Sequence, residues 1–357
     1  MSIEFEKKFK GKKVFITGHT GFKGSWLTIW LQTIGAHIKG YALKPDKISL
    51  NNQIKGKLNI ESVYADIRDR ERLNKEINSF QPDYIFHLAA QPLVRESYIT
   101  PVETFEINVM GTINLLDALK DLKKKCNVVI ITTDKVYKNN ETGKPFTEDN
   151  ALGGHDPYSS SKAAAEIATE SYRHSFFHPD KIIEHGKSIA TARAGNVIGG
   201  GDFAKDRIFP DIFRALSNNE IIEVRNPNAI RPWQHVLDPL SGYLTLAIAM
   251  NNNQNKYASA YNFGPEIKDV RTVEELVQHA IKSWSNGKYK NTNPKNAPHE
   301  AGTLKLNIKK AKEELNWTPK WKSDLAIEKS IMWYKNSLDR KADIFGLCIN
   351  DINDFKS

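Results

Sequence analysis

The sequence predicts an α/β protein: a doubly wound parallel sheet with a second, smaller α/β substrate domain. Two observations lead to this prediction. Short apolar segments alternate with amphipathic helical segments through the first half of the 357-residue chain, which is typical of parallel sheets covered by helices. A glycine-spaced loop also joins the first apolar segment directly to the first helical one, as in the first turn of many doubly wound sheets.

The strands of the expected sheet are short, apolar and separated by helices. We expect strands at residues 14–17, 37–43, 63–66, 84–88, 128–132 and 189–193. We expect helices at residues 22–34, 101–122 and 158–172. The first of these helices has apolar residues at helical spacing and stops at Gly35, because glycine adopts the left-handed conformation that ends helices.

After residue 194 the alternation becomes less regular, and a second domain is expected. Helices are expected at 208–216, 239–250, 273–284 and 323–334, and short strands at 221–224 and 261–263. The boundary is not clean, because the chain is expected to return once to the first domain. We therefore assign residues 1–194, with a return segment at about 236–263, to a dinucleotide-binding domain. Residues 195–235 and 264–357 are assigned to the substrate domain.

Composition narrows the class of protein. The chain is 40% hydrophobic and 26% charged, as in ordinary globular proteins, and its net charge is +9. Its lysines are scattered and form no stripe interleaved with aromatic residues, so we expect an anionic small ligand and no nucleic acid. Two cysteines, Cys126 and Cys348, make a disulfide framework or a thiolate metal site implausible, and no metal is expected. Without an apolar leader or a run of 18 apolar residues, we expect a cytoplasmic protein with no membrane partner.

The loop Gly18-His19-Thr20-Gly21-Phe22-Lys23-Gly24 is a candidate phosphate-binding turn. Its glycines allow close backbone approach, and the helix that follows presents free N–H groups to a pyrophosphate. At the end of the second strand the run Gly40-Tyr41-Ala42-Leu43-Lys44 has no carboxylate for a ribose, which leaves NAD and NADP both open. Asp66 and Ile67 follow the third strand and are candidates for contact with the adenine; a turn aspartate is the alternative.

Tyr158 and Lys162 form the candidate catalytic pair, since they lie one helical turn apart on one face. A phenol has a pKa of about 10, and a neighbouring ammonium favours the phenolate that can take a hydroxyl proton. Thr133-Asp134-Lys135 closes the fifth strand, at the sheet edge that faces the ligand crevice. Together these residues indicate hydride chemistry on an alcohol, although Asp134 and Lys135 taken alone fit a surface ion pair equally well.

These motifs together resemble the extended short-chain dehydrogenase/reductases that act on nucleotide sugars and have the Rossmann fold. The resemblance covers about residues 12–319 and rests on the glycine loop, Leu88-Ala89-Ala90, Thr133-Asp134-Lys135, Tyr158-x-x-x-Lys162 and Arg193-x-x-Asn196. The Thr-Asp strand end is similar to the 4,6-dehydratases, most of which carry Glu where this chain has Lys135. Similarity to the dehydratases of CDP-glucose rests on Lys135 with the whole glycine loop from Gly18 to Gly24, Gly199-Gly200-Gly201-Asp202, Arg231-Pro232-Trp233-Gln234-His235-Val236 and Pro298-His299-Glu300-Ala301.

The resemblance implies NAD as cofactor and a redox-neutral loss of water that yields CDP-4-keto-6-deoxyglucose. Tyr158, kept ionised by Lys162, takes the proton of the carbon-4 hydroxyl, and Thr133 bonds the carbon-4 oxygen. Asp134 protonates the departing carbon-6 hydroxyl. Lys135 is either the base at carbon 5 or a group that positions Asp134 or the carbon-6 hydroxyl.

The resemblance also implies the binding residues and the assembly. The implied cofactor-binding residues are those of the glycine loop together with Leu88, Ala89, Ala90, Tyr158 and Lys162. The implied substrate-binding residues are Gln91, Arg193, Asn196, Asp202, Arg207, Arg231 and His299, with Glu300 beside the last. A homodimer or higher homo-oligomer is expected, with the helices at 101–122 and 158–172 in a four-helix interface.

Two alternatives stay open. A nucleotide-sugar 4-epimerase uses the same Tyr–Lys pair but needs no acid, and small hydroxyl residues are more typical of it than Asp134-Lys135. A non-catalytic NAD(P)-sensing protein of this fold would tend to lose Tyr158 or Lys162, and both are present. His87, Trp26 and Trp30 are expected in the core.

Overall fold

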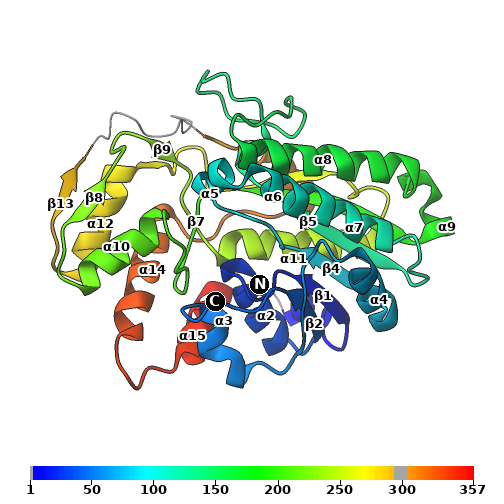
Figure 1. Cartoon of the computed structure of the whole chain (residues 1–357), viewed down its shortest axis with the longest axis horizontal. Coiled ribbons are helices and arrows are strands. Elements are labelled where there is room, and N and C mark those ends of the chain that lie inside the picture. The colour runs from blue at the N-terminus through cyan, green and yellow to red at the C-terminus, as the bar shows by residue number, and fades with distance from the viewer. Residues whose placement is uncertain (1–2, 293–303) are drawn as a thin grey trace.

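The computed structural model describes residues 3–292 and 304–357. Within these residues a seven-stranded parallel sheet has the order β11-β6-β5-β4-β1-β2-β3. Figure 1 labels strands β1, β2, β4 and β5 of this sheet. Its strands are β1 (Lys13–Thr17), β2 (His37–Ala42), β3 (Glu61–Tyr64), β4 (Tyr84–His87), β5 (Cys126–Ile131), β6 (Lys187–Ala194) and β11 (Ala260–Phe263). The predicted doubly wound sheet is confirmed. Strand β3 starts two residues earlier than expected, because its pairing with β2 begins at Lys39 and Glu61.

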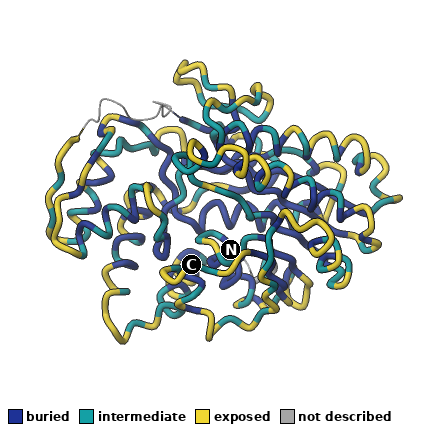
Figure 2. The backbone as a smooth tube through the Cα atoms, in the orientation of Figure 1, coloured by how far each residue is buried: buried dark blue, intermediate teal, exposed yellow. Residues whose placement is uncertain are grey.

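Helices cover both faces of the sheet. Phe15 of β1 packs in one apolar cluster with residues of α4 (Arg70–Phe80) and α7 (Gly111–Ala118), such as Leu73 and Leu115. Its neighbours Val14 and Ile16 pack in the other cluster with α2 (Phe22–Thr33) and α11 (Leu237–Asn252). Because successive strand residues point to opposite faces, a strand buried on both sides has to be apolar throughout. Figure 2 shows the buried sheet between helices whose outer faces are exposed.

The order of the strands reverses at β1. Strand β2 lies on one side of β1 and β4 on the other, so the connections leave β1 in opposite directions. A crevice forms at such a switch point, outside the carboxyl ends of the strands, and it is where open α/β sheets bind ligands. The glycine loop after β1 and Leu88 after β4 meet there, and a Cβ on Gly18 would lie 2.8 Å from the Leu88 carbonyl carbon.

The helix expected over 101–122 is interrupted. It consists of α6 (Pro101–Phe105), a five-residue π-helical segment η2 (Glu106–Met110) and α7, which ends at Ala118. Asn108 in the π segment donates to Oγ of Ser161 (2.8 Å) and to the Gln91 carbonyl (3.1 Å). The π turn therefore places an amide between the loop after β4 and the helix α8 (Pro157–Ser175), a role that such turns often have at functional sites.

The second half of the chain forms a smaller layer beside the sheet. Helices α10 (Ile208–Ser217), α12 (Val273–Trp284) and α14 (Ser323–Ser337) pack together, and strands pair two by two: β8 (Ile222–Val224) with β13 (Tyr289–Asn291), β9 (Ile230–Arg231) with β12 (Arg271–Thr272), and β7 (Val197–Ile198) with β10 (Gln234–His235). The last helix, α15 (Ile344–Lys356), was not expected from the sequence and packs against α2 and α14.

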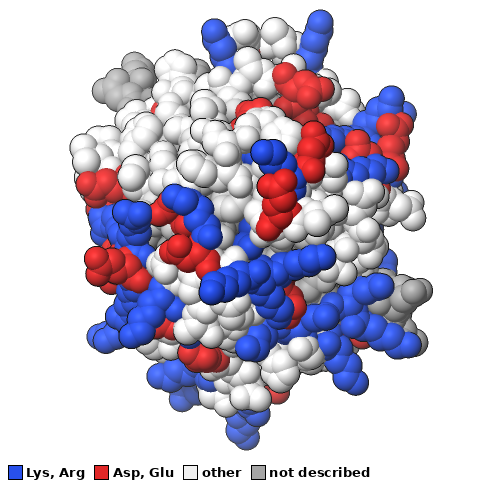
Figure 3. Space-filling model, turned by 90° about the vertical axis from the view of Figure 1, so that its right-hand side faces the viewer, with Lys and Arg blue, Asp and Glu red and all other residues white. Residues whose placement is uncertain are grey.

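Short elements complete the described chain: α1 (Ile3–Lys7), α3 (Leu50–Ile54), η1 (Lys55–Lys57), α5 (Val94–Ile99), η3 (Asp134–Val136), η4 (Pro179–Lys181), α9 (Ile182–His185) and α13 (Lys309–Leu315). No helix in the described ranges has the length and apolar character needed to cross a membrane. On the face drawn in Figure 3, basic side chains are interspersed with acidic and uncharged ones and gather toward the lower half of the view.

Candidate functional site

A cavity of about 1730 Å³ lies at the carboxyl ends of the strands. It extends from the glycine loop and the ends of β2 and β3, past the end of β5 and the start of α8, to the segments around α10 and β9. The predicted site residues that line it are Gly18, Thr20, Gly21, Phe22, Lys23, Gly24, Asp66, Ile67, Leu88, Ala89, Ala90, Thr133, Lys135, Tyr158, Asn196, Asp202, Arg207 and Arg231. The structure thus gathers on one cavity motifs that are far apart in the sequence.

The glycine loop has the close contacts that a phosphate-binding turn requires. Gly18 has φ +74°, and a Cβ there would lie 2.7 Å from the backbone nitrogen of Ala89. A Cβ on Gly24 would lie 2.1 Å from the Gly18 carbonyl oxygen, so the helix can approach the strand this closely only with glycine. Helix α2 begins at Phe22 after Gly21, which has no side chain to cap it, and its first N–H groups remain available to an anion. These residues fit the pyrophosphate of a dinucleotide.

Beyond the glycine loop, the cavity reaches the ends of β2 and β3. Leu43 and Lys44 line it, and neither offers a carboxylate to a ribose. Asp66 lines it too, but its carboxylate forms an ion pair with Arg68 (2.7 Å) and accepts from the Arg68 backbone N–H (2.8 Å). The hydrogen bonds from Arg68 hold the pKa of Asp66 below its usual value. Asp66 therefore does form the local turn that was the alternative explanation, while remaining on the cavity wall.

Helix α8 carries the candidate catalytic pair. Its first turn is fixed by Asp156, whose carboxylate accepts from the Ser159 N–H (2.9 Å), and by Pro157 at the first helical position. Tyr158 lines the cavity, whereas Lys162 is buried outside its wall and donates to the Ile131 carbonyl (3.1 Å). Burial lowers the pKa of Lys162 to about 8, and the negative charge of Glu166 opposes that fall.

The ionisation of Tyr158 differs from the expectation. Lys162 was expected to keep the phenol ionised, but burial raises the pKa of Tyr158 to about 12. A hydrogen bond with Thr133 and the charge of Arg207 favour the phenolate, and the cost of placing its charge in buried surroundings exceeds both. In this structure the side chain is a phenol at neutral pH.

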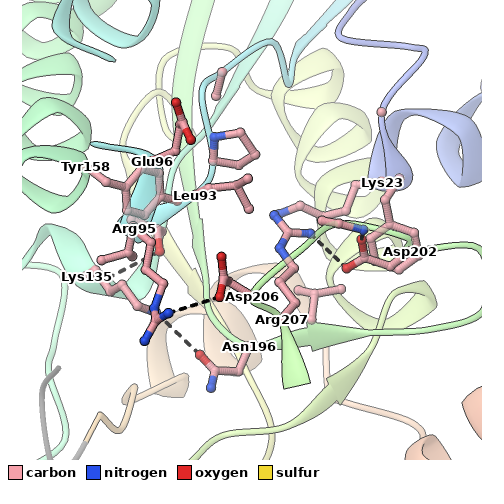
Figure 4. Close-up of a pocket in the computed structure, with 18 of the residues that line it drawn as sticks. Lys23, Leu93, Arg95, Glu96, Lys135, Tyr158, Asn196, Asp202, Asp206 and Arg207 are labelled. Atoms are coloured by element: carbon pink, nitrogen blue, oxygen red, sulfur yellow. Dashed lines mark hydrogen bonds and ion pairs between the residues drawn. The ribbon is translucent and has the colours of Figure 1, made fainter. Parts of the chain in front are cut away.

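The end of β5 places an acid directly behind the cavity wall. Asp134 is 1% exposed, and its Oδ1 accepts from Oγ1 of Thr133 (3.0 Å) and from Nζ of Lys135 (3.2 Å). Its Oδ2 is buried and has no hydrogen-bond partner. Lys135, 26% exposed, also donates to Oδ1 of Asn196 (3.4 Å), and both of these residues face the cavity in Figure 4. Thr133 and Lys135 therefore form the wall in front of the Asp134 carboxyl.

Two residues expected to bind substrate lie elsewhere. Arg193 is buried in an ion pair with Glu166 (2.9 Å), and its Nη1 donates to the Tyr137 hydroxyl and the Glu148 carbonyl, so four of its five N–H donors bond within the protein. Gln91 folds back on its own loop, where its Oε1 accepts from the Leu93 N–H (2.6 Å). Neither is on the cavity wall. His299 and Glu300 lie outside the described residues.

Three charged residues that the sequence analysis passed over lie on the cavity. Asp206, with φ +60°, pairs with Arg95 of α5 (3.1 Å) and with Arg225 after β8 (3.2 Å). Figure 4 shows Arg95 and Asp206 pointing toward one another beside Asn196. These charges are far apart in the sequence, on α5 and in two loops, and they form no motif, so the sequence contains no signal for them. A further pair, Asp202 and Arg207 (2.8 Å), consists of residues that were expected at the substrate site.

The residues expected in the core are buried. His87 is 1% exposed and lies between Oγ1 of Thr17 (2.7 Å) and Oγ1 of Thr112 (3.1 Å); burial lowers its pKa to about 3. Trp26 and Trp30 of α2 are fully buried. In the described part of the chain, His, Cys, Asp and Glu side chains form no group of three or more that could hold a metal ion.

Comparison with known sequences gives two results. The sequence profile of the family described as GDP-mannose 4,6 dehydratase matches residues 15–330. The chain is also 45% identical, over 99% of its own length and 98% of the relative's, to a CDP-glucose 4,6-dehydratase from Salmonella typhimurium.

Solved structures share the fold at lower identity. A dTDP-glucose 4,6-dehydratase from Bacillus anthracis in complex with NAD aligns with a TM-score of 0.76 at 22% identity, covering 92% of this chain and 98% of that one. A UDP-glucose 4-epimerase from Thermotoga maritima with UDP-glucose aligns with a TM-score of 0.76 at 21% identity, covering 92% and 100%. At these identities the likeness concerns the fold alone.

Proposed function

Because the chain belongs to the GDP-mannose 4,6 dehydratase family, we propose that it is a nucleotide-sugar 4,6-dehydratase that converts CDP-glucose into CDP-4-keto-6-deoxyglucose and water. The observation that carries the proposal is the 45% identity, over nearly the whole chain, to a CDP-glucose 4,6-dehydratase. The cavity supports it, since the glycine loop and the phenol of Tyr158 line one space large enough for a dinucleotide and a sugar nucleotide, and a buried carboxyl lies directly behind its wall.

We assign the glycine-loop half of the cavity to NAD. The contacts of Gly18 and Gly24, with the uncapped start of α2, support binding of its pyrophosphate there. When bound, NAD supplies the acceptor for the carbon-4 hydride and its later donor to carbon 6. Leu88, Ala89 and Ala90 after β4 complete the wall on this side.

In the proposed first step Tyr158 takes the proton of the carbon-4 hydroxyl, and Thr133 donates a hydrogen bond to the same oxygen. The step requires the phenolate, and the ammonium of Lys162 favours it. Loss of hydride leaves a ketone at carbon 4. The ketone acidifies the proton on carbon 5, because the negative charge that forms there is delocalised onto the carbonyl oxygen.

In the proposed second step Asp134, in its acid form, donates a proton to the carbon-6 hydroxyl, which leaves as water. The Oδ2 atom, which has no partner, supports this role because no internal bond holds it back. Lys135 either takes the carbon-5 proton and returns a proton to carbon 5 when hydride reaches carbon 6, or it positions Asp134, with which it is paired at 3.2 Å. The variant Lys135→Met separates these roles: loss of carbon-5 exchange with deuterated solvent supports the base, and retention supports positioning.

The proposal is tested by incubating the protein with NAD and CDP-, GDP-, UDP- or dTDP-glucose and following the alkaline absorbance of 4-keto product. We expect product with CDP-glucose and much less with the others. A 4-epimerase would interconvert the sugars and accumulate no 4-keto-6-deoxy product. A non-catalytic NAD(P)-sensing protein would be indicated if neither product formed and Tyr158→Phe changed no measured property. Product from another nucleotide alone would reassign the substrate.

We also propose a homodimer through α6, η2 and α8. This face exposes apolar side chains, among them Val102 (71%), Met110 (48%) and Ile167 (57%). A shallow hollow of about 480 Å³ lies on it, lined by Pro101, Val102, Phe105, Glu106, Val109, Met110 and Ala164. Light scattering of the wild type and of Val102→Glu tests the proposal: the wild type should have the mass of two chains and the variant that of one.

The domain division likewise remains a proposal, with residues 1–194 and about 236–263 in the dinucleotide-binding domain and 195–235 and 264–357 in the substrate domain. The pairing of β11 with β6 supports the return segment. Helix α15, within the second range, packs on α2, and so the last residues also contact the first domain.

A further inference from the structure

A buried carboxylate, Glu166, lies one helical turn beyond Lys162 on α8. Its side chain is 3% exposed and accepts four hydrogen bonds. Oε1 accepts from Oγ1 of Thr132 and from Nε of Arg193 (3.0 Å). Oε2 accepts from Oγ1 of Thr191 (2.7 Å) and from Nη2 of Arg193 (2.9 Å). Its bonding capacity is therefore filled, and none of the three donors belongs to its own helix.

These bonds connect the two parts of the proposed catalytic site. Thr132 immediately precedes Thr133 and Asp134 at the end of β5, while Glu166 shares its helix with Tyr158 and Lys162. Lys162 donates to the carbonyl of Ile131, the residue before Thr132. Helix α8 is therefore hydrogen-bonded to two consecutive residues at the end of β5, Ile131 and Thr132. A shift of the helix along the strand would break both bonds.

The carboxylate also contributes charge. Burial would raise the pKa of Glu166, but the charge and hydrogen bonds of Arg193, with the bonds from Thr132 and Thr191, lower it below its ordinary value, so the group is ionised. The other charges around it are Arg173 on α8 and Arg193 on β6. Around Lys162 the titratable neighbours are Tyr158, one turn earlier on α8, Lys23 of the glycine loop and His87 of β4. Burial lowers the pKa of Lys23 to about 7, and it lowers the pKa of His87 to about 3, which leaves His87 neutral at pH 7. Glu166 is thus the carboxylate that acts on Lys162.

We propose that Glu166 is a positioning residue of the dehydratase: it fixes α8 against the end of β5 and keeps Lys162 in its ammonium form, while Arg193 holds the carboxylate in place. This inference rests on the proposed function of Tyr158 and Lys162. It assigns to Arg193, which sequence analysis placed at the substrate, a role inside the protein.

The test is the pH dependence of kcat/KM for CDP-glucose in Glu166→Gln. If only the form with an ionised Tyr158 and a protonated Lys162 is active, the rate rises with pH until Lys162 loses its proton and is level above that point. Loss of an adjacent negative charge moves this break down by about one pH unit. We therefore expect the ratio of the rate at pH 9 to the rate at pH 6 to be about ten-fold lower in the variant than in the wild type, with KM changed less than three-fold.

Two further variants keep the test decisive. Glu166→Gln alone leaves the buried charge of Arg193 without its partner, which can unfold a protein. The double variant Glu166→Gln/Arg193→Met removes both charges, and we expect a smaller shift of the break in the same direction. Glu170→Gln is the control, because Glu170 is on the same helix and is exposed, with His174 at 3.9 Å as its ion-pair partner; it should leave the profile unchanged.

Each outcome has one meaning. A break at the wild-type pH in a folded variant, or an equal loss of rate at pH 6 and pH 9, overturns the inference and leaves the proposed function intact. Unfolding of both the single and the double variant, measured by circular dichroism, also overturns it, since the role is then purely structural. Absence of 4-keto product from the wild type overturns the proposed function, and this inference with it.

Discussion

The carboxyl of Asp134 occupies the space that any side chain on Gly195 would need. A Cβ on Gly195 would lie 1.9 Å from Oδ2 and 2.2 Å from Cγ of Asp134. Gly195 follows β6 and Asp134 follows β5, and these strands are neighbours in the sheet. Close packing leaves no room for both groups, so the Asp134 carboxyl can occupy this position only because residue 195 has no side chain.

Gly195→Ala should therefore impair dehydration. The added methyl group has to displace the Asp134 carboxyl, and a misplaced general acid costs about 10²–10⁴-fold in rate. We expect kcat for 4-keto product to fall by about 100-fold or more, while the affinity for NAD, measured by calorimetry, stays within three-fold. Gly56→Ala is the matched control, because a Cβ at Gly56 has no heavy atom within 4 Å. A variant at full rate would mean that Asp134 is not the acid.

Tyr158→Phe should abolish most activity without affecting the fold. The change removes only the hydroxyl that, in the proposed mechanism, takes the carbon-4 proton, and general bases contribute about 10²–10⁴-fold. We expect kcat to fall within that range and KM to change by less than about five-fold, as measured by product formation from CDP-glucose. Tyr64→Phe serves as the control, since Tyr64 is 41% exposed and lies outside the cavity wall. Comparable losses in the two variants would count against a special role for Tyr158.

The wild-type pH profile should rise and then become level near pH 8. Burial raises the pKa of Tyr158 to about 12, so the phenolate fraction grows about ten-fold per pH unit up to that value. Burial lowers the pKa of Lys162 to about 8, so above pH 8 the loss of its ammonium offsets that growth. The measurement is kcat/KM for CDP-glucose from pH 6 to 9.5. A rate that continued to rise ten-fold per unit through pH 9.5 would contradict this assignment.

Asp238→Asn should stabilise the protein above neutral pH. Asp238 is fully buried at the start of α11, where burial raises its pKa to about 7 although backbone N–H groups of Lys320 and Trp321 oppose the rise. Because the folded pKa lies above the unfolded value of about 3.9, the folded state binds the proton more tightly, and stability falls as pH rises from about 4 to 7.

The amide carries no charge and keeps the acceptor for Lys320, whose N–H lies 2.6 Å from Oδ1. At pH 8 we expect the variant to be more stable by about 1–3 kcal/mol, seen as a higher midpoint of thermal unfolding, with most of the gain lost at pH 5 and all of it below about pH 4. Asp149→Asn, at an exposed loop position, is the control and should have no effect. The same gain at both pH values would exclude titration of Asp238 as its cause.

The sequence predicted the helix starts that depend on neighbouring residues alone. Helix α2 begins at Phe22 and α8 at Pro157, within a residue of expectation, because helical apolar spacing and a proline start can be recognised without knowledge of the fold. Helix α4 was missed, although Asp69 caps it and Leu73 and Ile77 have helical spacing. The π segment had no signal, since the contact of Asn108 with Ser161 that accompanies it joins residues 53 positions apart.

By itself the sequence determined the parallel α/β class, the glycine-rich turn after β1 and the presence of Tyr158, Lys162 and the Thr133–Lys135 strand end, because periodicity, glycine spacing and residue chemistry are properties of the chain. Only the tertiary structure decided that Arg193 pairs with Glu166 rather than with a ligand, and that Tyr158 is a phenol. Both results depend on which groups pack around the side chain. Arg193 and Thr191 lie two residues apart on β6, so their side chains are on the same face of the sheet, and α8 covers that face. The protonation of Tyr158 depends on how deeply the folded protein buries its side chain, and burial cannot be read from one segment of the sequence.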